Sequence, residues 1–172
     1  NTTASRKMAV LDPIEVEITN FEEGRVEYFE VSNNPTDENA GTRTVMFSKN
    51  IYVEADDYMD EPPKKYYRLA IGNEVRLKGA YYVTCTGVER DENGNVTEIH
   101  CTYDPESKGG QTPDGRKVKG TIHWVSEKHS VDATVRLYER LFNVENPSDE
   151  SKGSFIENIN TESVEVLENC KI

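Results

Sequence analysis

The chain has few residues that could form a covalent framework or a membrane span. Its 172 residues include three cysteines, Cys85, Cys101 and Cys170, and a single tryptophan, Trp124. Three scattered cysteines are too few for a disulfide scaffold, so we expect free thiols and a cytoplasmic protein. No apolar run approaches the roughly 18 residues of a membrane helix, which predicts a soluble chain without a membrane partner.

Sequence signatures of common enzyme classes are also missing. The chain contains no G-x-x-x-x-G-K-[ST] phosphate loop, no G-x-S-x-G turn, and no cysteine and histidine grouping at zinc spacing. His100 and Cys101 are neighbours that point to opposite faces of a predicted strand, so we expect no metal site. The acidic run at 56–61 lacks the alternating ligands and the glycine of a calcium loop. We therefore expect neither a catalytic site nor a cofactor in this chain.

The beginning of the chain has no initiator methionine and no apolar segment. Residues 1–7 lack the hydrophobic core that defines a secretory signal peptide. A strand-like pattern begins almost immediately afterwards. We therefore expect the chain to be a piece of a longer protein.

Positive charge is scarce and unevenly placed. The chain has 20 lysines and arginines against 32 acidic residues, which gives a formal net charge of −12. Acidic residues crowd the ranges 15–30, 56–61 and 145–168. Basic residues concentrate elsewhere, at Lys64, Lys65, Arg68, Arg76 and Lys78 and again at Arg116, Lys117 and Lys119. An acidic body with a basic stripe suits a protein that binds one nucleic acid and repels others.

Most of the chain alternates β-branched or aromatic residues with polar ones between turn signals, which predicts an all-β fold. The strands are expected at 13–19, 26–31, 42–47, 51–54, 66–69, 74–77, 81–88, 96–103, 119–125, 134–142 and 163–168. Asn93-Gly94 is the strongest hairpin signal. The segment 134–142 also fits a helix, although its β-branched entry favours a strand. In addition to the strands, we expect one helical turn at 56–59 and a short helix capped by Ser154. Short, regularly spaced strands favour β-barrels.

Two segments carry the signal for nucleic acid. Residues 64–69 interleave lysines and an arginine with two tyrosines, and aromatic rings stack on unpaired bases while cations bind phosphates. The tyrosines fit an ordinary barrel core equally well, so both interpretations stay open. Residues 113–126 join a Pro-Asp-Gly turn, a basic cluster and a strand in which Trp124 and Ile122 share one face. These segments are the candidates for a surface that binds nucleic acid.

Five segments, in this order along the chain, resemble the C-terminal anticodon-binding region of the glutaminyl-tRNA synthetase family. They are 6–13 (RKMAVLDP), 65–77 (KYYRL and GNEVRL), 101–104 (CTYD), 115–126 (GRKVKGTIHWVS) and 135–142 (VRLYERLF). The last segment is also similar to eukaryotic-type glutamyl-tRNA synthetases. The run at 115–126 resembles the glutamine enzymes, and we expect a bacterial one.

The resemblance implies a fold and partners. The fold is two antiparallel β-barrels of the ribosomal protein L25-like kind. Residues 1–25 and 145–172 would form part of the proximal barrel, which is incomplete here, and 26–144 would form mainly the distal barrel. The implied partners are the anticodon loop of glutamine tRNA and the catalytic domain of the same polypeptide, with no role for DNA. The full-length class I enzyme would use ATP with magnesium.

The resemblance also implies which side chains contact the anticodon. Arg6 and Lys65 would contact the middle base, a uracil, and Arg68 the third base, a guanine. Arg76 and Lys78 would hold the first nucleotide through its base and phosphate. Lys65 stands where a glutamine can occur in the family. Lys78 stands where an arginine can occur, and a lysine suits a phosphate better than a base edge. Arg6, Arg68 and Arg76 should then face one groove, and the assignment fails if they point apart.

Two questions stay open at this point. Arg116, Lys117 and Lys119 are expected either to contact RNA backbone or to serve as structural charges. Two other functions also fit the sequence: an acidic β-barrel that binds protein, and an L25-like barrel that binds ribosomal RNA. A steep dependence of affinity on salt favours either RNA function over the protein-binding one.

Overall fold

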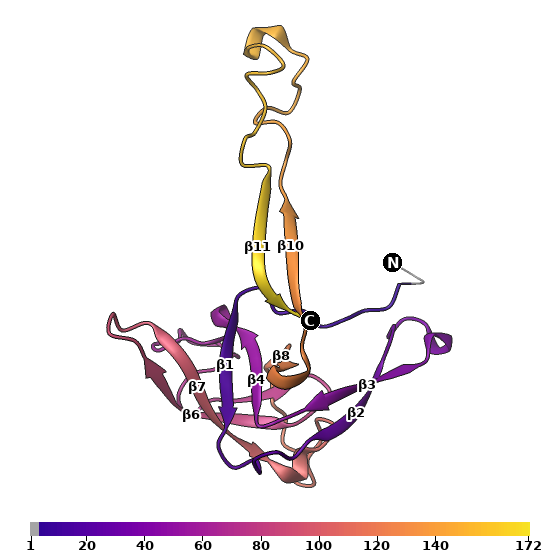
Figure 1. The fold of residues 1–172 in the computed structure, drawn as a ribbon, viewed down its shortest axis with the longest axis vertical. Coiled ribbons are helices and arrows are strands. Elements are labelled where there is room, and N and C mark those ends of the chain that lie inside the picture. Colours follow the sequence, from indigo (N-terminus) through magenta and orange to yellow (C-terminus); the bar gives the residue numbers. More distant parts are fainter. Residues whose placement is uncertain (1–3) are drawn as a thin grey trace.

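The computed structural model describes residues 4–172 and consists almost entirely of β-structure (Figure 1). Its strands are β1 (Pro13–Ile18), β2 (Glu27–Ser32), β3 (Thr42–Phe47), β4 (Asn50–Glu54), β5 (Glu74–Leu77), β6 (Tyr82–Arg90), β7 (Val96–Asp104), β8 (Thr121–Ile122), β9 (Val125–Ser126), β10 (Asp132–Tyr138) and β11 (Val164–Lys171). Its 3₁₀ helices are η1 (Glu38–Ala40), η2 (Ala55–Asp57), η3 (Pro105–Ser107), η4 (Glu127–His129) and η5 (Glu150–Lys152). Within 4–172, no helix is long and apolar enough to cross a membrane. The prediction of an all-β chain is confirmed.

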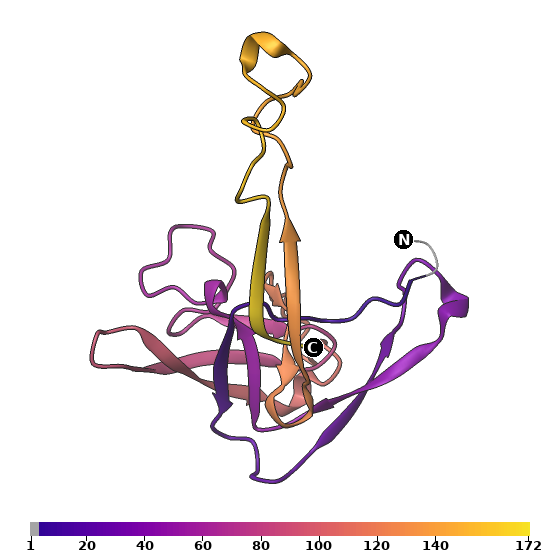
Figure 2. The same ribbon diagram turned by 45° about the horizontal axis from the view of Figure 1, so that its top comes forward.

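The main sheet has seven strands in the order β8-β5-β6-β7-β1-β4-β9. Its two outermost strands, β8 and β9, are separated in sequence by only His123 and Trp124. Two linking residues span only about 10 Å when extended, so the two edges of the sheet must come close together. The sheet therefore curls around its core, as Figures 1 and 2 show.

The core follows from the alternation of apolar and polar residues along these strands. Phe47 lies at its centre, fully buried, with its ring edge-on to Phe21, Phe29, Tyr81 and Trp124 at centroid distances of 5.1 to 6.2 Å. Edge-to-face arrangements at such distances are favourable for aromatic rings. Trp124 is a core residue, as its place in the alternating pattern predicts.

Two smaller sheets complete the fold. Strands β2 and β3 pair antiparallel, and so do β10 and β11. The β10–β11 hairpin projects from the body in both views, with its connection at the far end (Figures 1 and 2). A bridge between Val10 and Lys171 ties its base to the N-terminal segment. The assignment of 1–25 and 145–172 to a proximal barrel, and of 26–144 to a distal one, stays a prediction, and its residues 1–3 lie outside the described part.

The sequence places several elements correctly and misplaces others. The hairpin around Asn93-Gly94 is present as β6 and β7. The strand predicted at 66–69 is wrong: the chain turns there, with Lys65 at a φ of 70° and Tyr66 N–H donating to Pro63 O at 3.1 Å. The strand predicted at 119–125 is divided into β8 and β9, because its two ends pair with opposite edges of the sheet.

The remaining differences lie at element ends. Strand β10 ends at Tyr138 rather than at 142, and β11 continues to Lys171. The helical turn near 56–59 lies at Ala55–Asp57. The helix expected after Ser154 is a set of turns, in which Ser154 Oγ accepts a hydrogen bond from Glu157 N–H at 3.3 Å. Strand and helix ends are the least predictable part of a sequence pattern.

Candidate nucleic-acid interface

The N-terminal segment places Arg6 beside two other cations. Arg6 N–H donates to Asn33 O at 2.7 Å, and its guanidinium donates to Thr36 Oγ1 at 3.4 Å, so the β2–β3 hairpin holds it. Arg6, Arg43 and Lys78 line one cavity of about 350 Å³. Lys7 lines this cavity too, and four cations around one cavity create a positive potential on an otherwise acidic protein. Such a potential attracts a polyanion.

Arg68 lies in a second cavity, of about 470 Å³, with a different character. Its Nη1 is 3.3 Å from Asp57 Oδ1 and donates to Asp56 O at 3.2 Å. Burial raises the pKa of Asp57, and the charge of Arg68 opposes that rise. The guanidinium is about half exposed, so donors remain available to a ligand in this cavity.

The contact between His123 and Lys78 places the two cavities next to each other. His123 lines the cavity of Arg68, and its Nε2 is 3.4 Å from Lys78 Nζ in the cavity of Arg6. Burial, and then the charge of Lys78, lower the pKa of His123, so its imidazole is neutral at neutral pH. Trp124 fixes this junction, because its indole N–H donates to Lys78 O at 3.0 Å.

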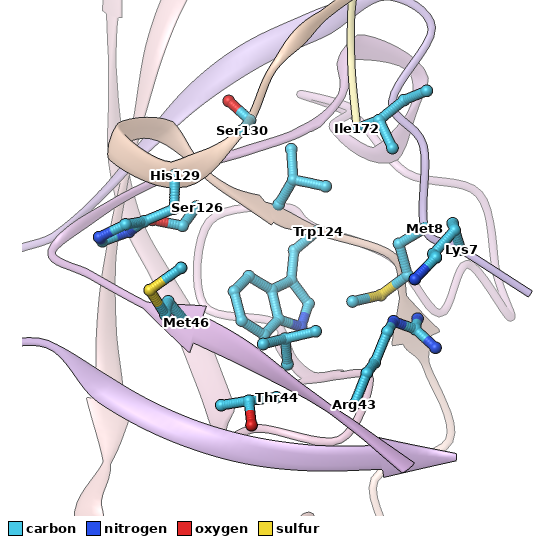
Figure 3. Close-up of a pocket in the computed structure, with 12 residues that line it drawn as sticks. Lys7, Met8, Arg43, Thr44, Met46, Trp124, Ser126, His129, Ser130 and Ile172 are labelled. Atoms are coloured by element: carbon cyan, nitrogen blue, oxygen red, sulfur yellow. The ribbon is translucent and has the colours of Figure 1, made fainter. Parts of the chain in front are cut away.

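A third, more apolar pocket lies beside Trp124, next to the cavity of Arg6. Figure 3 shows this pocket, of about 160 Å³, with Met8 and Met46 among its lining residues. Lys7 and Arg43 line both this pocket and the cavity of Arg6. A groove along the N-terminal segment therefore combines a cationic part with an apolar part.

Comparison with protein families identifies the family of the chain. A family model described as "tRNA synthetases class I (E and Q), anti-codon binding domain" matches residues 4–104. A second model with the same description matches residues 121–172. The chain belongs to this family. The first match includes Arg6, Arg68 and Lys78, and the second includes the segment that carries His123 and Trp124.

Individual relatives of this anticodon-binding domain are similar over nearly all of it. The glutamine–tRNA ligase of Clostridium perfringens is 55% identical over 170 residues, which are 98% of this chain and 30% of that protein. That of Rhodopirellula baltica is 52% identical over 168 residues, 97% of this chain and 28% of that protein. The chain thus spans about 30% of the length of the curated relatives that it matches.

In this anticodon-binding domain, two of the expected contact residues lie apart from the cavities of Arg6 and Arg68. The Arg76 guanidinium lies over the Tyr82 ring, 5.3 Å from its centroid, and donates to Tyr82 Oη at 3.1 Å. Its Nε is buried and has no hydrogen-bond partner among residues 4–172. Lys65 lies in an exposed turn. The three arginines do not line one pocket, and the role of Arg76 rests on the resemblance alone.

Arg116, in the basic cluster at 116–119, is neutralised within this domain. Arg116 forms ion pairs of 2.5 to 2.8 Å with three carboxylates, those of Glu74, Asp104 and Asp114. The nearby Thr112 hydroxyl, followed by the hydrogen bonds from Arg116, lowers the pKa of Asp114 to about 2. Of the two roles expected for Arg116, this geometry favours the structural one.

The two lysines of this cluster are exposed. Lys119 Nζ lies 5.1 Å from the centroid of the Tyr67 ring and 3.5 Å from its hydroxyl. The Tyr67 ring is about half exposed, which leaves aromatic surface beside a cation. Lys117 is exposed as well. Both lysines remain candidates for contacts with RNA backbone.

Arg43 and His123 join the interface although no sequence pattern marks them as site residues. Arg43 follows a polar loop, and no nearby aromatic or basic residue marks it. It joins Arg6 only because β3 pairs with β2, next to the N-terminal segment. Alternation with Ile122 and Trp124 places His123 on the polar face, and only its approach to Lys78, 45 residues away, makes it part of the interface.

Proposed function

We propose that this chain binds the anticodon loop of a glutamine tRNA within a longer glutamine–tRNA ligase. The relatives named above are glutamine–tRNA ligases, and the chain matches about 30% of their length. The rest of the polypeptide would attach glutamine to the tRNA with ATP and magnesium. The chain itself would supply recognition and no chemistry, in the cytoplasm and without DNA or a membrane as partners.

The observation that carries this proposal is the pair of neighbouring cavities around Arg6, Lys78 and Arg68. In one of them Arg68 is surrounded by carboxylates, including Asp57. A phosphate is repelled by such carboxylates, whereas a base edge offers both acceptors and donors. Guanine presents O6 and N7, which suit a bidentate arginine, and amino protons, which suit a carboxylate. The cavity of Arg68 therefore fits an unpaired guanine.

The neighbouring cavity suits the backbone and another base. Arg6, Arg43 and Lys78 supply positive charge with only Glu30 among the acids that line it. Lys78 is a compact charge that suits a phosphate, and Arg6 has the fork that suits a base edge. We assign the middle base to Arg6, with Lys65 as a second contact. We assign the first nucleotide to Arg76 and Lys78, as the family resemblance implies.

The proposal is tested by binding of the chain to the anticodon stem-loop of a glutamine tRNA. We expect a change of the middle base from uracil to another base to weaken binding about tenfold or more, because a lost base contact costs about 1–3 kcal/mol. We also expect affinity to fall steeply with salt. Fluorescence anisotropy with labelled stem-loops measures both.

Each alternative gives a different result in this assay. Equal affinities for the two stem-loops would contradict anticodon recognition. Affinity that is independent of salt would favour a domain that binds protein, and tighter binding to structured ribosomal RNA would favour an L25-like function. Each outcome separates one function from the others.

A further inference from the structure

A cluster of possible metal ligands lies on the outer face of the main sheet. His100 Nε2 is 3.5 Å from Glu98 Oε1, 3.9 Å from Glu17 Oε2 and 3.8 Å from Glu89 Oε1. The ligand atoms of Glu17, Glu98 and His100 all lie within 4.8 Å of one another. These three side chains are partly buried, and each retains between 26 and 29% of its exposure.

Strand pairing brings these residues together from three neighbouring strands. In the parallel pair of β1 and β7, Glu17 is the register partner of His100. In the antiparallel pair of β6 and β7, Glu89 is opposite Glu98, and Gly87 is opposite His100. Open space surrounds the position where a Cβ of Gly87 would lie. Gly87 has no side chain to cover the imidazole of His100, so the nearby glutamate carboxylates can approach it.

The distances match those between the ligands of a small tetrahedral ion. Zinc binds imidazole nitrogen and carboxylate oxygen at about 2.0 to 2.2 Å, so neighbouring ligand atoms in a tetrahedron lie about 3.3 to 3.6 Å apart. The Glu98 oxygen is already at that distance from His100 Nε2, and the Glu17 and Glu89 oxygens are within a few tenths of an ångström of it. The ligand atoms of Glu17, Glu98 and His100 are at most 4.8 Å apart, so rotations of the two glutamate side chains close the remaining gap. We propose that Glu17, Glu98 and His100 bind a divalent transition-metal ion of the zinc type. The exposed Glu89 carboxylate, 3.8 Å from His100 Nε2, can turn toward the ion as a fourth ligand.

The imidazole determines which ions fit. Calcium and magnesium take oxygen ligands, whereas imidazole suits zinc and its neighbours in the transition series. Lys49 Nζ lies 2.8 Å from Glu17 Oε1, which orients that carboxylate and leaves Oε2 toward His100. A ligand that a neighbouring side chain holds in place, as Lys49 holds Glu17, binds a metal more tightly. The negative charges of Glu17, Glu89 and Glu98 outnumber the single positive charge of Lys49 beside them. A bound dication would reduce this local excess of negative charge.

The site would connect the two parts of the main sheet. Strands β6 and β7 belong to one hairpin, and β1 pairs with β4 on the other side. An ion held by Glu17 on β1 and by His100 on β7 cross-links these parts at their parallel junction. An ion that binds only the folded chain stabilises it. The sequence pattern did not reveal this site, since Glu17 is 83 residues from His100.

Calorimetric titration of the untagged chain with zinc chloride tests this inference. We expect one zinc ion per chain and a higher melting temperature, with no such effect from magnesium chloride at the same concentration. His100→Gln should weaken zinc binding at least about tenfold, whereas the matched variant His129→Gln should bind as the wild type does. The melting temperature without zinc shows whether each variant folds.

Cobalt(II) gives a second measurement that does not depend on a variant. We expect the visible absorption of tetrahedral cobalt without the thiolate-to-cobalt charge transfer that cysteine ligands produce. The inference is contradicted if no zinc binds, if His100→Gln and wild type bind zinc equally, or if thiolate charge transfer shows that Cys85, Cys101 or Cys170 holds the ion. None of these results bears on RNA binding.

Discussion

Replacing Gly120 by alanine is expected to destabilise the chain by about 3 kcal/mol. A Cβ at this position would lie 1.9 Å from the carbonyl oxygen of Tyr67 and 2.9 Å from its carbonyl carbon. Both are backbone atoms, so no side-chain rotation relieves the overlap. Gly120 O also accepts a hydrogen bond from Arg76 N–H at 2.9 Å, which holds Gly120 against strand β5. The segment 66–69 must therefore move.

Urea unfolding followed by circular dichroism measures this loss. Gly87→Ala is the matched control, because Gly87, in strand β6, has nothing within 4 Å of the added Cβ. In metal-free buffer we expect its free energy of unfolding to change by no more than about 0.5 kcal/mol. Equal losses in the two variants would show that the close approach of Gly120 to Tyr67 does not exist.

Replacing Phe47 by alanine is expected to cost about 3 to 5 kcal/mol, the usual range for removing a buried phenylalanine ring. Phe47 is fully buried, and four aromatic rings contact it edge-on. These rings come from separate parts of the chain, so they cannot all move in to fill the space. The loss combines lost burial with the cavity that remains.

The same unfolding measurement tests this second prediction. Tyr28→Ala is a suitable control, because Tyr28 is 65% exposed on the adjacent strand β2. We expect it to change the free energy of unfolding by roughly 0.5 kcal/mol. A loss below about 1 kcal/mol for Phe47→Ala would mean that Phe47 is not at the centre of the core.

Local patterns in the sequence predict much of the fold. The β6–β7 hairpin depends on Asn93-Gly94 and on alternation within a few residues, and both are visible in the sequence. The burial of Trp124 follows from the same alternation. The division of 119–125 into β8 and β9 depends instead on pairing with β5 and β4, which lie more than 40 residues away. No local pattern contains that information.

The interface shows the same division between local and distant causes. The basic cluster at 116–119 is visible in the sequence. Glu74 and Asp104, whose carboxylates neutralise Arg116, come from other parts of the chain, on strands β5 and β7. Arg6 and Lys78 are 72 residues apart and share a cavity through the fold alone. Only the family resemblance selected them together. The resemblance therefore supplied what composition and spacing did not.

The most direct measurement is a double-mutant cycle between Arg68 and the third anticodon base. Binding of wild type and Arg68→Gln is measured with stem-loops that carry guanine or adenine at that base. We predict that the base change weakens wild-type binding about tenfold or more and affects Arg68→Gln little, because the contact is already lost. Equal effects of the base change on both proteins, with both folded by melting temperature, would contradict recognition of that base by Arg68.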